Sequence, residues 1–428
     1  MFKIQQVEIT GFWGSKKVNA TFNDSVNIII GQNGTGKTTF MNILQSILTV
    51  DPEGLYENSF DSAKITLSDG VKRRTIRAER KEMKNLQNFP FPVVEYHISN
   101  RAYSLPLYFS DESRPMPVLF KKRSVEEIQR IRNDLEQFVS VSSLSVHRAG
   151  LDLESDIRDR PRARIISAVD SRLGFLINKL TQYQLELSDQ ARQVSAALQK
   201  DVLTSLLYAS KDKEKLRHYP VEFDEENERT KLTAAYKQLG LSGSDVLKKI
   251  HDHSAAVASA VKNLAELRNK SSLSSNKQLS VDIGALEALV STQNVVRMSL
   301  NAEVKTAEIF KQTRLFTETL AEFIKDKVFE FVSGSLIVKS PKITIQKLSS
   351  GEKQLLILMI ETLLQRQVPY IFLADEPELS LHISWQRNVI SAIKKINPNA
   401  QIIVATHSPE VAGKFRGSLL DMEDLTHA

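Results

Sequence analysis

The sequence predicts an α/β protein in which a helical segment interrupts a mixed β-sheet. Three observations lead to this fold class. A glycine-rich loop, residues 31–38, connects a short apolar run to a helical pattern. Two later apolar runs, Tyr370–Ala374 and Gln401–Ala405, each end in polar or charged residues, as buried parallel strands do. Between these two regions, over residues 156–332, strand patterns are absent and helical periodicity dominates.

The N-terminal part is predicted to be rich in β-strands, because apolar and β-branched residues occur there in short runs. The turn sequence Ser68-Asp69-Gly70 is typical of a hairpin. The later parallel strands are separated by a helix over Ile383–Ile396. The strands expected in the N-terminal part are Lys3–Thr10, Val18–Phe22, Val26–Ile30, Ala63–Leu67, Val71–Ala78, Val93–Ile98 and Leu144–His147.

The glycine-rich loop matches the pattern G-x-x-x-x-G-K-[ST] from Gly31 to Thr38. It lies between the strand Val26–Ile30 and a helical stretch over Thr39–Leu48, so backbone N–H groups and the helix dipole point to one spot. A glycine-rich turn without a ligand is the alternative, but the matching context on both sides favours a nucleoside triphosphate with Mg²⁺. The residues expected to bind it are Asn33, Gly34, Thr35, Gly36, Lys37, Thr38 and Thr39.

Three further segments follow near the other end of the chain. Leu348–Gln354 precedes the apolar stretch Leu355–Ile360, the strand at Tyr370 ends in the adjacent carboxylates of Asp375 and Glu376, and a strand also precedes His407. Each has an ordinary explanation: a helix N-cap, an acidic turn or a structural histidine. Their joint occurrence, in this order and behind a phosphate-binding loop, predicts a catalytic site instead.

These motifs resemble those of the ABC-type ATPases, in the branch that includes RecF, the SMC proteins and the OLD family (AAA_15-like and AAA_21-like ATPases). The resemblance covers roughly residues 1–110 and 340–415 and implies an ABC-ATPase head. The stretch Asp375-Glu-Pro-Glu-Leu-Ser-Leu-His382 resembles the OLD and RecF group more closely than it resembles transporters. The Walker A, signature, Walker B, D-loop and H-loop motifs of the family match Gly31–Thr38, Leu348–Gln354, Tyr370–Glu376, Glu378–His382 and His407.

The resemblance also implies a role for each residue, since phosphoryl transfer depends on positioning and charge stabilisation. Glu376 would orient or deprotonate the attacking water, and His407 would contact the γ-phosphate. Ser349 and Gly351 would complete the site of a second protomer, which implies a homodimer or a higher homo-oligomer. The predicted catalytic residues are Glu376, Lys37 and His407, and the predicted metal-binding residues are Thr38 and Asp375. A glutamine of the family that touches Mg²⁺ stays unassigned among Gln87, Gln129 and Gln137.

We predict three segments: the first lobe of the head over residues 1–155, a helical insertion over 156–335, and the second lobe over 336–428. An ordinary helical subdomain and a short antiparallel arm both fit the insertion; a compact insertion with a short coiled coil is favoured. Further helices are expected at Lys231–Leu239, Asp245–Arg268, Gly284–Phe316 and Thr317–Val332. The apolar stripe consists of Leu173, Leu176, Leu180, Tyr183, Leu187, Val194, Leu198 and Val202.

Composition limits the possible classes. The chain has 428 residues, a formal net charge of +6 and no cysteine, which excludes disulfides and thiolate metal sites. A signal peptide and an 18-residue apolar run are both lacking, so we expect a cytoplasmic protein without membrane contact. Basic clusters permit contact with DNA or RNA phosphates, although each alone is usually a solvated surface. They are Lys72–Arg74 with Arg77, Arg80, Lys81 and Lys84; Lys121–Arg123; and Arg158, Arg160, Arg162 and Arg164.

Residues 408–428 are too few for the nuclease domain that follows the ATPase in OLD-family nucleases. The resemblance therefore suggests an ATPase subunit that controls a separate effector, a nuclease or toxin. Such pairs are found in bacterial anti-phage defence, as in PARIS, Septu and some retrons. A RecF-like ATPase acting directly on DNA is the alternative. A scaffold that uses ATP only as structural glue is a third possibility.

Overall fold

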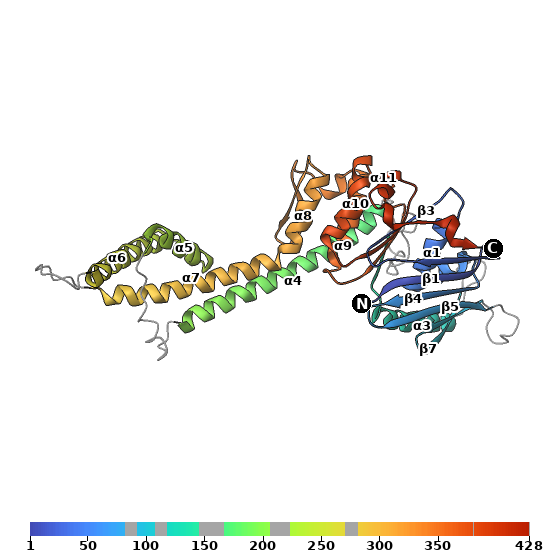
Figure 1. The fold of residues 1–428 in the computed structure, drawn as a ribbon, viewed down its shortest axis with the longest axis horizontal. Coiled ribbons are helices and arrows are strands. Elements are labelled where there is room, and N and C mark those ends of the chain that lie inside the picture. Colours follow the sequence, from blue (N-terminus) through green and yellow to red (C-terminus); the bar gives the residue numbers. More distant parts are fainter. Residues whose placement is uncertain are drawn as a thin grey trace, which may run out of the picture. The chain divides into compact units, whose positions relative to one another are not determined.

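The computed structural model describes residues 1–81, 92–107, 118–144, 167–205, 223–269, 281–379 and 381–427. It contains two compact units, one formed by Met1–Gln182 with Thr313–Ala428 and the other by Tyr183–Gln312. The first unit combines β-sheets with helices, whereas the described secondary structure of the second is helical (Figure 1). The predicted α/β class with a helical insertion is thus confirmed.

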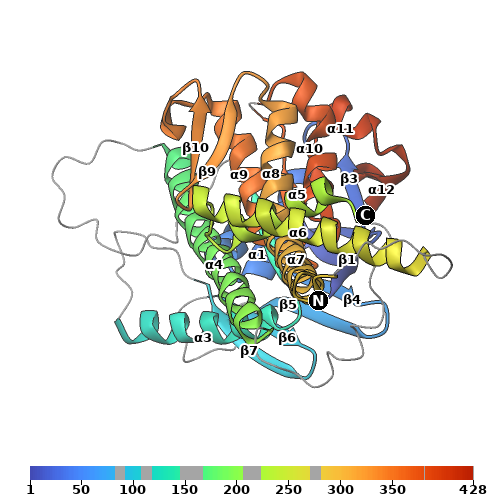
Figure 2. The same ribbon diagram turned by 90° about the vertical axis from the view of Figure 1, so that its left-hand side faces the viewer.

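An antiparallel sheet of seven strands forms one layer of the first unit, in the order β14-β2-β1-β4-β5-β6-β7. Helix α3 (Val118–Glu136) lies at its β7 edge in both ribbon views (Figures 1 and 2). The strands are β1 (Lys3–Phe12), β2 (Lys16–Thr21), β4 (Ser62–Ser68), β5 (Arg73–Lys81), β6 (Val93–Ile98), β7 (Arg101–Pro106) and β14 (Thr426–His427).

The predicted hairpin between β4 and β5 is confirmed, with Ser68 opposite Arg73. Strand β5 begins two residues later than the predicted Val71. The carboxylate of Asp69 explains the delay, since it accepts hydrogen bonds from the backbone N–H groups of Val71 at 2.9 Å and Lys72 at 2.7 Å. These amides are held in the turn, where an Asp side chain competes with the strand ladder.

A fully parallel sheet of five strands forms the second layer, in the order β13-β3-β12-β11-β8. Helix α1 (Lys37–Thr49) shares one hydrophobic core with both sheets. The side-chain amide of Gln401 joins the layers: its oxygen accepts from the Ile4 N–H at 2.8 Å and its nitrogen donates to the Ile4 carbonyl at 2.7 Å. The strands are β13 (Leu419–Asp421), β3 (Val26–Ile30), β12 (Gln401–Ala405), β11 (Ile371–Asp375) and β8 (Val141–Leu144). The predicted strand Leu144–His147 is wrong at its start, and residues 145–147 lie outside the described residues.

The C-terminal half of the first unit contributes most of its remaining helices. Helix α9 is buried along nearly its whole length, which agrees with its continuous apolar sequence. The elements of this half are α8 (Lys311–Phe323), α9 (Ser350–Leu364), α10 (Ile383–Ile396), α11 (Pro409–Gly413) and α12 (Met422–Leu425), with 3-10 turns at Ile345–Lys347 and Arg416–Ser418. The short helix α2 (Pro52–Glu57) follows α1.

The predicted helix Thr317–Val332 is wrong in its second half. Helix α8 ends at Phe323, and Val328–Val332 forms strand β9, which pairs with β10 (Ser335–Ser340). The sequence Val-Phe-Glu-Phe-Val alternates with the period of a strand. Ser333 and Gly334 both have positive φ angles, 49° and 82°, as the tight turns of hairpins require. The predicted helix Gly284–Phe316 is likewise divided, between α7 (Ile283–Ile309) and α8.

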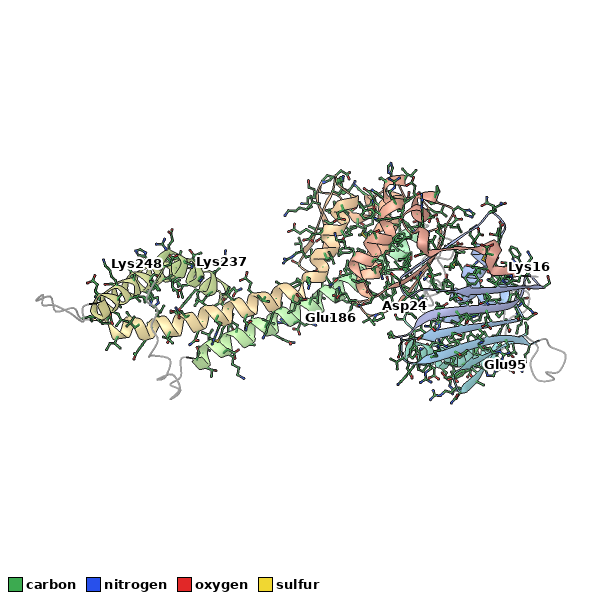
Figure 3. All side chains as sticks on the ribbon, viewed as in Figure 1. Lys16, Asp24, Glu95, Glu186, Lys237 and Lys248 are labelled. Atoms are coloured by element: carbon green, nitrogen blue, oxygen red, sulfur yellow. The ribbon has the colours of Figure 1, made fainter. Side chains whose placement is uncertain are left out.

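The second unit consists of the later part of α4 (Ala168–Ser205) with α5 (Glu225–Gln238), α6 (Ser244–Asn269) and α7. Apolar residues of α6 and α7 form one small core, and residues of α5, α6 and α7 form another. Lys237 and Lys248 lie on its exposed outer surface (Figure 3). Most residues of the predicted stripe on α4 are buried, so the helical prediction is confirmed, while the coiled coil stays a prediction.

The second compact unit, Tyr183–Gln312, is shorter than the helical insertion predicted over residues 156–335. The start of α4 belongs to the first unit, because Asp170 forms an ion pair with Lys353 at 2.7 Å and Arg172 with Glu361 at 2.6 Å. The boundary at residues 155 and 156 lies outside the described residues, so the predicted division stays a prediction. Across the described part of the chain, none of the helices is long and apolar enough to cross a membrane.

Candidate nucleotide-binding site

The strand order brings three of the predicted motifs to one edge of the parallel sheet. Strand β12 lies between β3 and β11, with Ala405 opposite both Ile29 and Asp375. The loop after β3 is the glycine-rich loop, β11 ends in Asp375, and β12 leads to His407. In open parallel sheets, ligands bind outside the carboxyl ends of the strands. The candidate site therefore lies at this edge.

The glycine-rich loop has the geometry of an anion-binding turn. Gly34 and Gly36 have φ angles of 82° and 100°, and Gly36 is the N-cap of α1 without a side-chain cap. The first N–H groups of α1 are therefore left for another acceptor. A Cβ atom on Gly36 would lie 2.8 Å from the Phe12 ring, whereas one on Gly34 would meet no atom within 4 Å. The loop is packed on one side and open on the other, which fits a phosphate group.

Lys37 is folded across this loop. Its ammonium donates hydrogen bonds to the carbonyls of Gly31 at 2.8 Å and Gln32 at 2.9 Å, and the residue is 5% exposed. Burial lowers the pKa of Lys37, and the nearby carboxylates of Glu376 and Asp375 oppose this shift. The lysine ammonium is thus held within the glycine-rich loop.

Thr38 and Asp375 meet through their side chains. Burial raises the pKa of Asp375, while a hydrogen bond from Thr38 and the charge of Lys37 act in the opposite direction. A hydroxyl and a carboxylate are hard oxygen donors of the kind that Mg²⁺ prefers, and Mg²⁺ commonly uses few protein ligands together with phosphate oxygens. These two residues fit the predicted metal site.

Glu376 and His407 form a second pair beside Asp375. His407 Nε2 lies 3.7 Å from Glu376 Oε1. Glu376 has a φ of 49°, and its N–H donates to the Ala405 carbonyl at 2.8 Å. A left-handed conformation in a residue other than glycine costs about 1–3 kcal/mol and is common at functional sites. The hydrogen bond to β12 fixes the backbone from which this carboxylate extends.

Ser349 and Gly351 lie on a separate element, at the start of α9. Ser349 forms a capping box with Glu352: the Ser349 N–H donates to Glu352 Oε2 at 2.8 Å and the Glu352 N–H to Ser349 Oγ at 3.3 Å. Lys327 forms an ion pair with the same glutamate at 2.7 Å. The structure therefore brings together Lys37, Thr38, Asp375, Glu376 and His407, whereas the signature residues are presented by another helix.

Trp13 was not among the predicted site residues. This residue lies in the turn between β1 and β2, is 44% exposed and stacks on Phe12 with ring centroids 5.1 Å apart. The Lys16 ammonium lies 5.4 Å from the centre of its ring, and Figure 3 labels this lysine. A Cβ atom on Gly36 would come within 3.1 Å of the indole. An exposed tryptophan beside the phosphate loop offers a stacking surface for a base; its place in a turn between two glycines was the available signal.

The segment after α11 also reaches the site. Strand β13 pairs with β3 so that Asp421 lies opposite Ile30, directly before the glycine-rich loop. The charges of Asp421 and Glu423 act to raise the pKa of Lys37. Neither residue was predicted, because their approach depends on a pairing between distant parts of the chain.

The structure does not assign the glutamine that the family resemblance implies beside Mg²⁺. Gln87 lies outside the described residues, Gln129 donates to Asn133 on its own helix at 2.9 Å, and Gln137 is exposed after α3. Neither described glutamine is linked to the cluster around Lys37 by these contacts.

The densest basic cluster is largely engaged within the fold. The guanidinium of Arg74 lies 5.3 Å from the centre of the Phe138 ring, and that of Arg80 lies 5.4 Å from the centre of the Phe60 ring. Arg80 also donates to the Tyr56 carbonyl at 3.1 Å. These two arginines therefore have partners within the fold, whereas Lys72 and Arg73 of the same cluster are exposed, so contact with nucleic acid stays a prediction. Lys84 and Arg158–Arg164 lie outside the described residues, as do the side chains of Lys121–Arg123.

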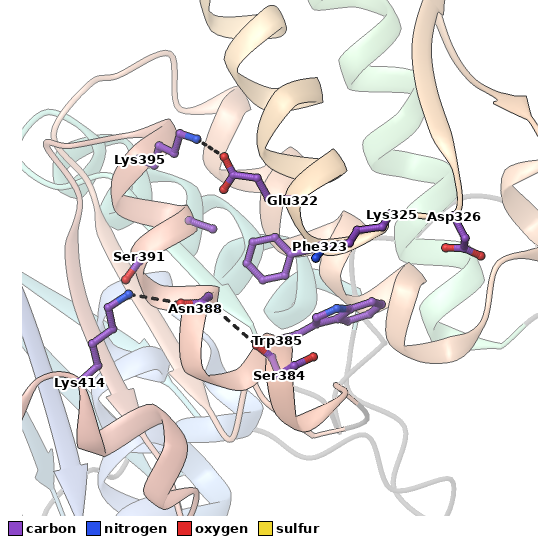
Figure 4. A pocket seen from close by; sticks show the side chains of 11 residues that line it. Glu322, Phe323, Lys325, Asp326, Ser384, Trp385, Asn388, Ser391, Lys395 and Lys414 are labelled. Carbon is purple, nitrogen blue, oxygen red and sulfur yellow. Dashed lines mark hydrogen bonds and ion pairs between the residues drawn. The ribbon is translucent and has the colours of Figure 1, made fainter.

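The first unit also contains a cavity of about 640 Å³ between α8 and α10 (Figure 4). Phe323 and Trp385 meet in it with ring centroids 6.4 Å apart, and Lys395 forms an ion pair with Glu322 at 2.6 Å on its rim. The predicted site residues do not line this cavity. The candidate nucleotide-binding site is therefore separate from this cavity.

Known proteins resemble this chain at three levels. The family AAA_15, described as AAA ATPase domain, matches residues 2–412. "Retron Ec83 probable ATPase" of Escherichia coli is 34% identical over 112 residues, covering 21% of each chain. "Retron Vc95 probable ATPase" of Vibrio cholerae is 29% identical over 121 residues, covering 24% of this chain and 23% of the relative. The matched segments therefore span less than a quarter of either relative.

Solved structures of SMC heads are also similar. The Smc head with an extended coiled coil from Pyrococcus furiosus has a TM-score of 0.44 and 14% identity, over 96% of this chain and 92% of that chain. The SMC head from Thermotoga maritima has a TM-score of 0.38 and 11% identity, over 96% and 91% of the two chains.

Proposed function

Because the chain belongs to the AAA_15 family of AAA ATPase domains, we propose that it binds and hydrolyses ATP and acts as a dimer that controls a separate effector. One observation carries the chemical part of this proposal. Lys37, Thr38, Asp375, Glu376 and His407 meet at the carboxyl ends of three adjacent parallel strands. This arrangement supplies the charges and the carboxylate base that phosphoryl transfer requires.

The nucleotide would bind with its phosphates at the N-terminus of α1. The N–H groups of the glycine-rich loop and the first helical turn would donate to phosphate oxygens. Lys37 would exchange the carbonyls of Gly31 and Gln32 for the β- and γ-phosphates, which are stronger acceptors because they are charged. Trp13 would stack on the base.

The Thr38 hydroxyl and the Asp375 carboxylate would hold Mg²⁺. When bound, the ion neutralises charge on the β- and γ-phosphate oxygens. Glu376 would orient the attacking water and accept its proton. His407, next to Glu376, would donate a hydrogen bond to the γ-phosphate and help to keep the carboxylate in place.

The signature residues support the proposal of a dimer. The start of α9 offers a hydroxyl and N–H groups at a helix N-terminus, which suits a γ-phosphate. In the single chain, Ser349 is engaged with Glu352 at its own helix start. A second copy would place this turn on the phosphates bound by the first, so one copy alone should bind ATP but hydrolyse it slowly.

The effector part of the proposal has two supports. Segments of the chain are similar to ATPases of retrons. In addition, α4 connects the signature helix α9 to the helical unit, since Asp170 and Arg172 pair with Lys353 and Glu361 and the helix continues beyond them. Closure of the ATP site would thus be transmitted towards the insertion, which would contact a nuclease or toxin in anti-phage defence. We place this activity in the cytoplasm.

Measurements of ATP turnover and particle mass test the proposal. We expect the wild type to hydrolyse ATP, and Glu376→Gln to bind ATP without turnover and to form a particle of about twice 48.3 kDa in light scattering. Lys37→Ala, which removes the phosphate-binding ammonium, should stay monomeric with ATP. A wild type without turnover would exclude hydrolysis, and a monomeric Glu376→Gln with bound ATP would exclude the dimer.

A mixing experiment tests the shared site directly. Lys37→Ala and Ser349→Arg should each be inactive alone, because each breaks both sites of a dimer. An equal mixture should regain turnover, because a mixed dimer keeps one site with an intact lysine and an intact signature. Copurification from the native host would test for an effector, while stimulation by DNA that fades with salt would instead favour direct action on DNA.

A further inference from the structure

A hydrogen-bonded network joins the D-loop to the segment that carries His407. Thr406, directly before His407, donates its hydroxyl to Oε1 of Glu378 in the D-loop. The N–H of Ser408, directly after His407, donates to Thr406 Oγ1 at 2.8 Å and also lies against the Glu378 carboxylate. His407 is therefore flanked on both sides by residues that are tied to Glu378.

Gln386 adds a second tie between the same segments. Its side-chain oxygen accepts from Ser408 Oγ at 2.8 Å. Its side-chain nitrogen donates to the carbonyls of Leu381 at 3.1 Å and Glu378 at 3.5 Å, both in the D-loop. Because Gln386 lies in the first turns of α10, which directly follows the D-loop, these segments form one hydrogen-bonded unit.

The burial of Glu378 is energetically unfavourable if the side chain serves only to pack the fold. The residue is 5% exposed, and its Oε2 atom has no hydrogen-bond partner among the described residues. Burial raises the pKa of this carboxyl, and the charge of Glu376 acts in the same direction. Burying a carboxylate with incomplete hydrogen bonding is unfavourable, and an apolar side chain of similar volume would avoid this cost. A carboxylate at this position therefore indicates a use beyond packing.

We propose that Glu378 and Thr406 are positioning residues that hold His407 opposite Glu376. The proposal rests on the proposed hydrolysis of ATP at this site. Neither residue touches the reacting atoms: Glu378 fixes Thr406, Thr406 fixes the backbone on both sides of His407, and the imidazole is thereby held 3.7 Å from Glu376. A displacement of the D-loop is transmitted to His407 through the same bonds.

Replacing Thr406 with Val tests the proposal, since it keeps the side-chain shape and removes the hydroxyl. A misplacement of about 1 Å can reduce a rate by roughly a hundredfold. We expect kcat to fall by roughly ten- to a hundredfold, with the KM and the Kd for ATP changed less than about threefold. Thr406→Ser, which retains the hydroxyl, should keep kcat within about threefold of the wild type. Thr319→Val is the matched control, because Thr319 is fully buried on α8 and its hydroxyl donates to a backbone carbonyl outside the site.

Combination with His407→Ala separates positioning from a general structural defect. If Thr406 acts through His407, adding Thr406→Val to His407→Ala should not reduce kcat further, because interacting residues are not additive. Glu378→Leu removes the acceptor of the same hydrogen bond and should therefore lower kcat as Thr406→Val does. It replaces Thr406→Val in the test if that variant fails to fold. Wild-type kcat in a folded Thr406→Val or Glu378→Leu variant would overturn the proposal, as would a full additional loss in the His407→Ala background. A wild type without turnover would instead refute the proposed function and the inference with it.

Discussion

Replacing Arg172 with Met should destabilise the first unit through the carboxylate that this arginine neutralises. Arg172 donates to Glu361 Oε1 from Nε at 2.9 Å and from Nη2 at 2.6 Å, while Glu361 Oε2 accepts from the Ser142 hydroxyl at 3.1 Å. The glutamate side chain is 4% exposed and the arginine side chain 43% exposed. Without the arginine, the buried Glu361 carboxylate would keep only one of these three hydrogen bonds, the one from the neutral Ser142 hydroxyl.

The magnitude follows from this burial. Removing one partner of a fully buried ion pair costs about 3–5 kcal/mol. Because Arg172 is partly solvated, water already weakens the pair, and we expect a loss of roughly 2–3 kcal/mol in the free energy of unfolding at neutral pH. Arg130→Met, which removes the exposed pair with Glu127, is the control and should change this free energy by less than about 1 kcal/mol.

The loss should also depend on pH. Burial raises the pKa of Glu361, and Arg172 lowers it, so removing the arginine should raise this pKa further. The folded state then binds a proton more tightly than the unfolded state, so the stability of the variant falls as pH rises from the unfolded towards the folded pKa of Glu361. The variant and the wild type should therefore differ little in free energy of unfolding at acidic pH. The difference should reach its maximum above the folded-state pKa of Glu361.

Urea unfolding followed by tryptophan fluorescence measures this effect, because both tryptophans, Trp13 and Trp385, lie in the first unit. Unfolding curves at several pH values would give the free energy for each variant. The double variant Arg172→Met, Glu361→Gln should recover most of the loss, since no buried charge remains. A double variant no more stable than Arg172→Met, or a loss independent of pH, would refute the reasoning.

Three further predictions concern the nucleotide site. Trp13→Ala should raise the KM for ATP about tenfold, since base stacking contributes roughly 1–3 kcal/mol; an unchanged KM in a steady-state assay would exclude stacking. Gly36→Ala should lower the free energy of unfolding by about 1–3 kcal/mol and weaken ATP binding, because the φ of Gly36 is 100° and the added Cβ would press on Phe12. Denaturant titration measures the stability and calorimetry measures the binding. Wild-type values in both would contradict this geometry. Chelation of Mg²⁺ should abolish ATP hydrolysis, and hydrolysis that continues in excess EDTA would rule out the site at Thr38 and Asp375.

The fold of the glycine-rich segment was predictable because its signals are local. Val26–Ile30 is a short run that is apolar except for Asn27, and the glycines follow directly, so the strand has its predicted bounds. Helix α1 begins at Lys37, two residues before the predicted Thr39. The approach of Asp375 and His407 also followed from sequence, since the ends of parallel strands share one edge. Their separate roles in catalysis stay predictions.

Other features depend on contacts that sequence patterns do not contain. Trp13 gains its place from packing on Phe12 and Gly36, and Arg74 and Arg80 are engaged by aromatic rings from other elements. The strand at Val328–Val332 was missed because the surrounding helical periodicity outweighed five alternating residues, although the turn that follows was visible. Glu378 was predicted only as part of the D-loop match, because the sequence does not show its hydrogen bond to Thr406.

The position of β3 within its sheet has a consequence for biosynthesis. Both of its neighbours, β12 and β13, come from residues after 400, and the hydrogen-bonded residues Asn27 and Ile402 are 375 positions apart. Because residues 31–400 are synthesised between β3 and β12, this apolar strand must wait for that whole stretch before it can pair. Contacts of such long range form slowly and leave strand edges exposed to aggregation. Molecules released by termination before residue 401 would therefore leave β3 without both of its neighbours and would be substrates for chaperones and proteases.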